Sequence, residues 1–132
     1  MAHEIELPYT SKRLNKREEV HYHRRRSAWL LAAKLGDVTH ESYNESYKLL
    51  DRCKNVALGF SRLDETETEH NCNSPWRAHK RDLLIARMDK LNEELRPYGC
   101  HMLRAWCIED VYDYDFENHV PLNDNGYLHF FD

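Results

Sequence analysis

Nine histidines and four cysteines are the side chains in this sequence best suited to hold a metal ion. Two pairs lie close together: His70 is separated from Cys72 by one residue, and Cys100 is followed directly by His101. Imidazole and thiolate are the ligands that Zn²⁺ prefers. The residues between the pairs predict a helix of about 21 residues, which would separate them by about 31 Å at 1.5 Å per residue. We therefore expect no metal site and no cofactor.

Hydroxyl, thiol and carboxylate groups are numerous, but no sequence motif arranges them for catalysis. A nucleophile needs a neighbouring base, and no GxSxG elbow frames a serine. The sequence also has no P-loop, no dinucleotide-binding glycine pattern and no HExxH motif. Cys107 lies in a predicted strand and has the character of a small core residue. We expect a protein without catalytic activity and keep a small enzyme or metal protein as an alternative.

An acidic, aromatic segment near the C-terminus is the main candidate binding site. Aromatic side chains anchor protein interfaces, and carboxylates select a basic partner and accelerate its encounter. The alternative is that the aromatic rings form the core of a hairpin while the acids are solvated or pair with arginines. The candidate residues are Glu109, Asp110, Tyr112, Asp113, Tyr114, Asp115, Phe116 and Glu117.

From this segment we predict a non-catalytic protein-binding or inhibitor protein whose partner is basic, such as a nucleic-acid-binding enzyme or complex. Small, highly charged chains without catalytic motifs are common among viral accessory proteins, which makes a phage-type inhibitor a reasonable hypothesis. The charge distribution supports recognition by electrostatics. Residues 1–60 carry 11 Lys and Arg against 8 Asp and Glu, whereas residues 61–132 carry 8 against 15.

Three consecutive arginines in the basic half favour a second hypothesis, a nucleic-acid-binding accessory protein. Guanidinium groups bind phosphates, and a nearby aromatic ring can stack on a base. Three successive helical residues span about 200° of the helix circumference, so they cannot all face one groove. The alternative is a solvated helix face that pairs with the acidic half. The contact residues of this hypothesis are Arg24, Arg25, Arg26 and Trp29.

Two helices joined by a tight turn form the centre of the predicted fold. Gly36 suits a left-handed C-terminal cap, and Thr39 suits the N-cap of the next helix. Ser42 occupies the position where a capping box has Glu or Gln, so we expect no reciprocal box. The helix after the turn carries Glu41 and Glu45, which disfavours its insertion into a DNA groove. The apolar residues at helical spacing are Ala28, Leu31, Ala32 and Leu35 before the turn, and Tyr43, Tyr47, Leu50, Ala57 and Phe60 after it.

The flanking segments complete the prediction. Residues 12–26 form a charged helical approach, for which Thr10 or Ser11 is the expected cap. Residues 61–74 read as a linker, and Ser74 and Pro75 start a third helix. The apolar face of this helix is Trp76, Leu84, Met88, Leu91 and Leu95. After a Pro/Gly break, residues 101–116 and 127–131 read as strands, and residues 118–126 as the loop between them.

At 132 residues, the chain is most simply one domain, with a charged approach (1–26), a helical core (27–99) and an acidic aromatic β region (100–132). We predict an α+β fold: a three-helix core, in which a helical hairpin is joined by a third helix, with a small C-terminal antiparallel β-hairpin. No run of 18 apolar residues is present, so we expect no membrane span. A cytoplasmic location is the expectation, and the oligomeric state is left open.

Overall fold

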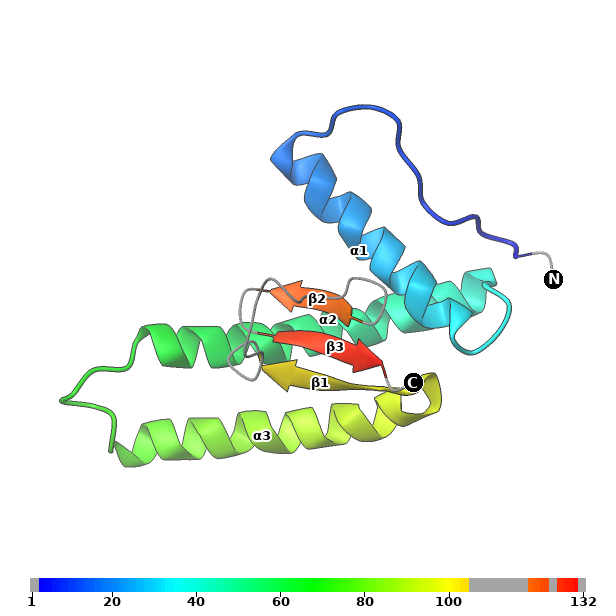
Figure 1. Ribbon diagram of the computed structural model, residues 1–132. Coiled ribbons are helices and arrows are strands. Elements are labelled where there is room, and N and C mark those ends of the chain that lie inside the picture. The colour runs from blue at the N-terminus through cyan, green and yellow to red at the C-terminus, as the bar shows by residue number, and fades with distance from the viewer. Residues whose placement is uncertain (1–2, 105–118, 124–125, 131–132) are drawn as a thin grey trace. The chain divides into compact units, whose positions relative to one another are not determined.

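The computed structural model describes residues 3–104, 119–123 and 126–130, and Figure 1 shows an α+β fold. The predicted class, three helices with a small antiparallel sheet at the C-terminal end, is confirmed. None of the helices in these ranges combines the length and apolar character needed to cross a membrane. The elements are α1 (Lys16–Ala33), α2 (His40–Glu65), α3 (Pro75–Leu95), the 3-10 helix η1 (Arg96–Tyr98), β1 (Cys100–Arg104), β2 (His119–Asn123) and β3 (Gly126–Phe130).

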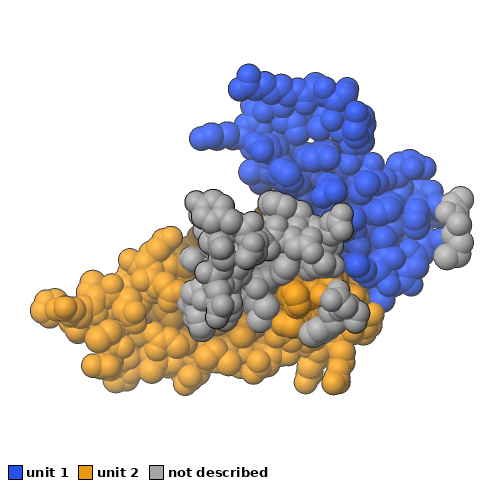
Figure 2. All heavy atoms as spheres, in the orientation of Figure 1, with its two compact units in different colours: residues 1–51 blue, residues 52–132 orange. Residues whose placement is uncertain are grey.

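Contacts divide the chain into two compact units, residues 1–51 and 52–132, coloured separately in Figure 2. The N-terminal segment, α1 and the first half of α2 belong to the first unit. The second half of α2, α3 and the sheet belong to the second unit. The prediction of a single domain stays a prediction.

Helix α1 begins later than the predicted caps, because Asn15 rather than Thr10 or Ser11 caps it. The Asn15 side chain accepts a hydrogen bond from Glu18 N–H at 2.9 Å, and the Glu18 carboxylate accepts one from Asn15 N–H. This capping box satisfies two backbone donors that a helix start leaves unpaired. The core residues of α1 lie in its last two turns: Ala28, Leu31 and Ala32.

The predicted corner between the first two helices is present, with two differences. Helix α1 ends at Ala33, so Leu35 falls outside it and is 53% exposed rather than buried. Gly36 has the expected positive φ, 133°. A reciprocal box does close the start of α2: Thr39 Oγ1 accepts from Ser42 N–H at 3.1 Å, and Ser42 Oγ accepts from Thr39 N–H at 2.9 Å. The serine hydroxyl thus replaces the Glu or Gln of the usual box.

The second half of α2 forms an antiparallel pair with α3 in the second unit (Figure 1). Helix α2 extends to Glu65 because Leu63 continues its buried stripe, so the connection covers residues 66–74 rather than 61–74. Ser74 caps α3 as predicted, with its side chain accepting from Arg77 N–H. Trp76 was predicted in the core but is 65% exposed, whereas Arg77 is buried. One residue turns a helix by about 100°, which places Arg77 on the face of Leu84, Leu91 and Leu95 and turns Trp76 away from it.

The sheet has three antiparallel strands in the order β1-β3-β2, within the part of the chain that the structure describes. Strand β2 lies in the segment that was predicted as a loop. Pro121 argues against a central strand in the sequence, but proline is tolerated on an edge strand such as β2. The predicted first strand beyond Arg104 lies outside the described residues. Asn92 on α3 accepts a hydrogen bond from Met102 N–H at 2.8 Å and so fixes β1 along α3. One face of the sheet is buried and carries Cys100, Met102, Leu122, Leu128 and Phe130.

The cap at the start of α2 can be tested by mutation. Thr39→Ala removes the oxygen that accepts the Ser42 N–H, and the free energy of unfolding should fall by about 1 kcal/mol. Urea unfolding at an unchanged m-value measures this loss. Thr10→Ala is the control, because the Thr10 hydroxyl contacts the Lys12 backbone in an exposed segment and its loss should cost less than about 0.5 kcal/mol. Equal losses in the two variants would contradict the capping role.

Candidate functional site

The N-terminal segment is fixed to the corner between α1 and α2. The Val38 carbonyl accepts hydrogen bonds from Glu4 N–H at 3.0 Å and Ile5 N–H at 3.3 Å. Val38 N–H donates to His3 Nδ1 at 2.8 Å, and Trp29 Nε1–H donates to the Ile5 carbonyl at 2.7 Å. With its first residues held here, the chain runs back to the start of α1 (Figure 1). The N-terminal segment therefore lies beside α1 instead of trailing away from it.

A hollow of about 660 Å³ lies where this returning segment meets the first turns of α1. Three cations, Lys12, Arg13 and Lys16, and a single carboxylate, Glu19, line it. Two aromatic rings on α1, Tyr22 and His23, contact each other edge to face at 5.4 Å. The remaining lining residues are Thr10, Leu14 and Asn15. The hollow thus combines excess positive charge with aromatic surface.

Ion pairs occupy only part of this positive charge. Lys12 Nζ lies 3.2 Å from Glu18, and hydrogen bonds from Lys12 and then from the Asn15 backbone lower the pKa of the Glu18 carboxyl. His23 Nε2 lies 3.7 Å from Glu19. These pairs are exposed to solvent, where such contacts are weak and easily exchanged. Arg13 and Lys16 are exposed and have no ion-pair partner among the described residues.

The four residues of the predicted nucleic-acid contact do not form one surface. Arg24 is ion-paired with Asp51 and lies 5.6 Å from the centre of the Tyr47 ring. The hydrogen bond to Asp51 raises the pKa of the Arg24 guanidinium. Trp29 donates its N–H to the N-terminal segment, and its ring contacts His3 at 5.1 Å. These contacts show that Arg24 and Trp29 stabilise the first unit itself. Arg25 is exposed and Arg26 is half-buried.

The sequence prediction overlooked the residues that line the hollow because it concentrated on the three arginines. A charge count over a wider window would have indicated the region. Residues 12–26 contain seven Lys and Arg against two Glu. The hollow itself arises from the return of the chain along α1, which no local sequence pattern specifies.

The acidic aromatic residues, Glu109, Asp110, Tyr112, Asp113, Tyr114, Asp115, Phe116 and Glu117, lie outside the described residues. Their role in binding a basic partner stays a prediction. Cys107 lies outside the described residues as well.

The cysteine–histidine pairs considered for zinc lie at opposite ends of α3, as expected from the length of that helix. Cys72, in the connection before α3, donates to the Glu69 carbonyl at 3.5 Å. Cys100 is buried at the start of β1, and its thiol approaches the Leu95 carbonyl at 3.9 Å. No three His, Cys, Asp or Glu side chains that the structure places gather closely enough to hold a metal ion.

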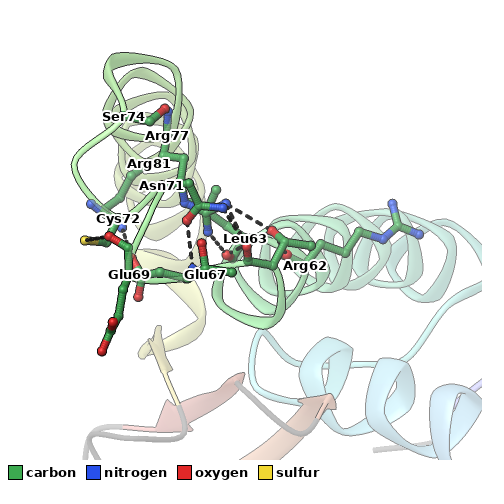
Figure 3. A network of polar contacts seen from close by, with 11 residues as sticks. Arg62, Leu63, Glu67, Glu69, Asn71, Cys72, Ser74, Arg77 and Arg81 are labelled. Carbon is green, nitrogen blue, oxygen red and sulfur yellow. Dashed lines mark hydrogen bonds and ion pairs between the residues drawn. The ribbon is translucent and has the colours of Figure 1, made fainter.

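Arg77 on α3 binds the end of α2 and the start of the connection that follows it, as Figure 3 shows. It is only 3% exposed, and its guanidinium donates to the Leu63 carbonyl and to Thr66 Oγ1, the latter at 3.1 Å. A third contact reaches the Thr66 carbonyl at 3.4 Å. The last carbonyls of a helix lack partners within the helix and attract positive charge. Arg77 therefore has a structural role, which its place in a charged sequence concealed.

A second, smaller hollow of about 310 Å³ lies between α2 and α3 in the second unit. It is lined by Arg52, Asn55, Val56, Arg87, Lys90 and Leu91. Arg52 is held by a two-point hydrogen bond to Glu94, at 2.8 and 2.7 Å. This hollow is basic too, but it has no aromatic residue in its lining.

Comparison of the chain with protein-family models, with curated proteins and with solved structures finds no match.

The buried contacts of Arg77 predict that two arginines on α3 contribute different amounts to the free energy of unfolding. Arg77→Met removes the hydrogen bonds that the buried guanidinium donates to the Leu63 carbonyl and Thr66 Oγ1, and the free energy of unfolding should fall by about 2–3 kcal/mol. Arg81→Met is the matched control, because Arg81 makes an exposed ion pair with Glu67 at 3.3 Å and should cost less than about 1 kcal/mol. Urea unfolding of both variants measures the difference. Similar losses would show that the Arg77 contacts contribute no more than a surface pair.

Thiol alkylation tests the burial of the cysteines. Burial raises the pKa of Cys53 to about 12, so roughly one thiol in 10⁴ is ionised at pH 8, and only the thiolate reacts. Cys72 is half-buried in the connection before α3 and should react with iodoacetamide in the folded protein. Peptide mass mapping should find Cys72 modified before Cys53, and Cys53 modified only after unfolding. Early modification of Cys53 would contradict the packing of α2.

Proposed function

We propose that this chain is a non-catalytic accessory protein that binds single-stranded nucleic acid through the N-terminal hollow. The observation that carries the proposal is the composition of this hollow, which Lys12, Arg13 and Lys16 line together with the Tyr22–His23 ring pair. Proteins that bind single strands combine a positive groove for the phosphates with aromatic rings on which bases stack.

The same geometry favours recognition of the nucleic acid backbone over reading of base sequence. The first turns of α2 present Glu41 and Glu45, which phosphates would repel. Arg24 is committed to Asp51 and is not available for a two-point contact with a guanine. Binding should therefore depend strongly on salt and weakly on sequence.

Binding of an acidic segment of a protein would use the same cations, and the ring pair is what favours nucleic acid. The role of residues 109–117 in holding a basic partner protein, as a phage-type inhibitor would, stays a prediction of the sequence. A cytoplasmic location likewise stays a prediction.

Fluorescence anisotropy with a labelled strand of about 20 nucleotides tests the proposal, with single-stranded DNA, single-stranded RNA and duplex DNA compared at increasing salt. Both single strands should bind more tightly than the duplex. Arg13→Gln combined with Lys16→Gln should lower the slope of log affinity against log salt by about 1.4, since each lost phosphate contact contributes about 0.7.

The matched control is Lys34→Gln combined with Lys48→Gln, which makes the same change in charge within the first unit, away from the hollow. It should leave the salt slope nearly unchanged. Tyr22→Ala should weaken binding of the single strands by about 1–3 kcal/mol through loss of stacking and should affect duplex binding less. No salt-dependent binding, or an equal loss in the variant and its control, would overturn the proposal.

A further inference from the structure

The hollow of about 310 Å³ between α2 and α3 is built from the same arrangement of residues on both helices. Each helix contributes two polar side chains and one apolar side chain at positions i, i+3 and i+4, which lie on one side of a helix. The helical repeat therefore brings three cations and one amide to a single place. The lining residues are Arg52, Asn55 and Val56 on α2, and Arg87, Lys90 and Leu91 on α3.

Two contacts between the helices flank the hollow along their length. On one side of it, Arg52 donates two hydrogen bonds to the Glu94 carboxylate, at 2.8 and 2.7 Å. On the other side, the Leu84 side chain lies against the backbone of Gly59. Because the helices are joined on both sides of it, the hollow belongs to the packing of the pair and does not depend on a loop.

The hollow lies on the side of α3 opposite to β1. Asn92 accepts a hydrogen bond from Met102 N–H on β1, so the side of α3 that carries Asn92 faces this strand. Lys90 precedes Asn92 by two residues, which corresponds to a rotation of about 200° around the helix. Strand β1 therefore does not cover the hollow, and both Arg87 and Lys90 are exposed.

Most of the positive charge in the hollow is available to a ligand. Within the part of the chain that the structure describes, Arg87 and Lys90 form no ion pair. The hydrogen bond from Arg52 lowers the pKa of the Glu94 carboxyl, and the charge of Lys90 lowers it further. Glu94 occupies two N–H donors of Arg52, and the remaining donors of this guanidinium stay available. One carboxylate beside three cations leaves an excess of positive charge.

A phosphate group matches these donors better than a carboxylate does. A phosphate ester carries about 1.5–2 negative charges near pH 7 and has three strong acceptor oxygens. An arginine suits two-point contact with a phosphate, a lysine supplies a point charge, and the amide of Asn55 adds a neutral donor. The hollow is also at the lower end of the size range of pockets that hold small ligands.

We propose that this hollow is a binding site for a phosphate group. Arg87 and Lys90 are its main donors, Asn55 is a neutral donor, and Arg52, which Glu94 holds in place, supplies the third cation. A small phosphorylated molecule and the backbone of a nucleic acid both present this chemistry. The site lies in the second unit, whereas the hollow of the proposed function lies in the first, so the two proposals are independent.

Titration calorimetry of the untagged full chain with inorganic pyrophosphate tests the site. We expect a dissociation constant below about 1 mM and a melting temperature that rises with pyrophosphate. Arg87→Gln combined with Lys90→Gln should weaken binding by about 100-fold or more, because each lost hydrogen bond to a charged group corresponds to about tenfold or more. The two single variants should each weaken binding by about tenfold, and they test the site even if the double variant unfolds.

Two variants with the same change in charge serve as controls. Lys80→Gln combined with Arg81→Gln changes α3 outside the lining and should leave pyrophosphate binding nearly unchanged. Arg13→Gln combined with Lys16→Gln changes the N-terminal hollow and should retain the binding that the Arg87 and Lys90 variant loses. Melting of each variant without pyrophosphate checks that it is folded.

Two further ligands test the preference for phosphate and its source. Citrate, a carboxylate of comparable charge, should bind more weakly than pyrophosphate. Unlabelled single-stranded DNA of about 20 nucleotides should not displace pyrophosphate, because no aromatic ring lines the hollow to stack on a base; displacement would assign the phosphate to nucleic acid.

Three results would overturn the proposal: pyrophosphate binding weaker than about 1 mM, equal binding of citrate, or an equal loss in the Arg87 and Lys90 variant and its control on α3. Binding of strands to the N-terminal hollow is measured separately, so failure of this site is distinguishable from failure of the proposed function.

Discussion

The close approach of α2 and α3 is the constraint on which the second unit depends. A Cβ atom at Gly59 would lie 2.7 Å from Leu84 Cδ2, so a larger residue at this position would require the Leu84 side chain to move. Phe60 and Leu63 on α2 and Leu91 and Leu95 on α3 are buried along the two helices. Packing against a helix is one of the ways in which a small sheet gains stability in water. Strand β1 is fixed to α3 by the hydrogen bond from Met102 N–H to Asn92.

Features set by neighbours in the sequence were predictable. Thr39 and Ser74 were identified as helix caps because a side-chain oxygen at that position satisfies backbone donors two or three residues ahead. The helical class followed from apolar spacing over several turns. Even here the detail depended on the fold: Ser42 completes a box that the usual residue preference did not anticipate, and Asn15 rather than Thr10 begins α1.

Features set by distant contacts were not predictable. Arg77 and Trp76 are adjacent, and residue type alone places the tryptophan inside and the arginine outside; the structure reverses them because the end of α2 offers carbonyl oxygens to a cation. Strand β2 forms by pairing with β3, and Pro121 made its sequence resemble a loop. For the candidate site, the sequence indicated basic residues near the N-terminus, but the hollow depends on the hydrogen bonds that hold Glu4 and Ile5 at Val38.

Pro121 has a consequence for the behaviour of the protein in concentrated solution. Strand β2 is at one edge of the sheet, where a regular row of unpaired N–H and C=O groups would invite another chain to add a strand. Proline has no N–H to offer, and the pairing with β3 shifts register between Pro121 and Asn123. A foreign strand would find an irregular template there. The residue that obscured β2 in the sequence thus also protects this edge against β-type aggregation.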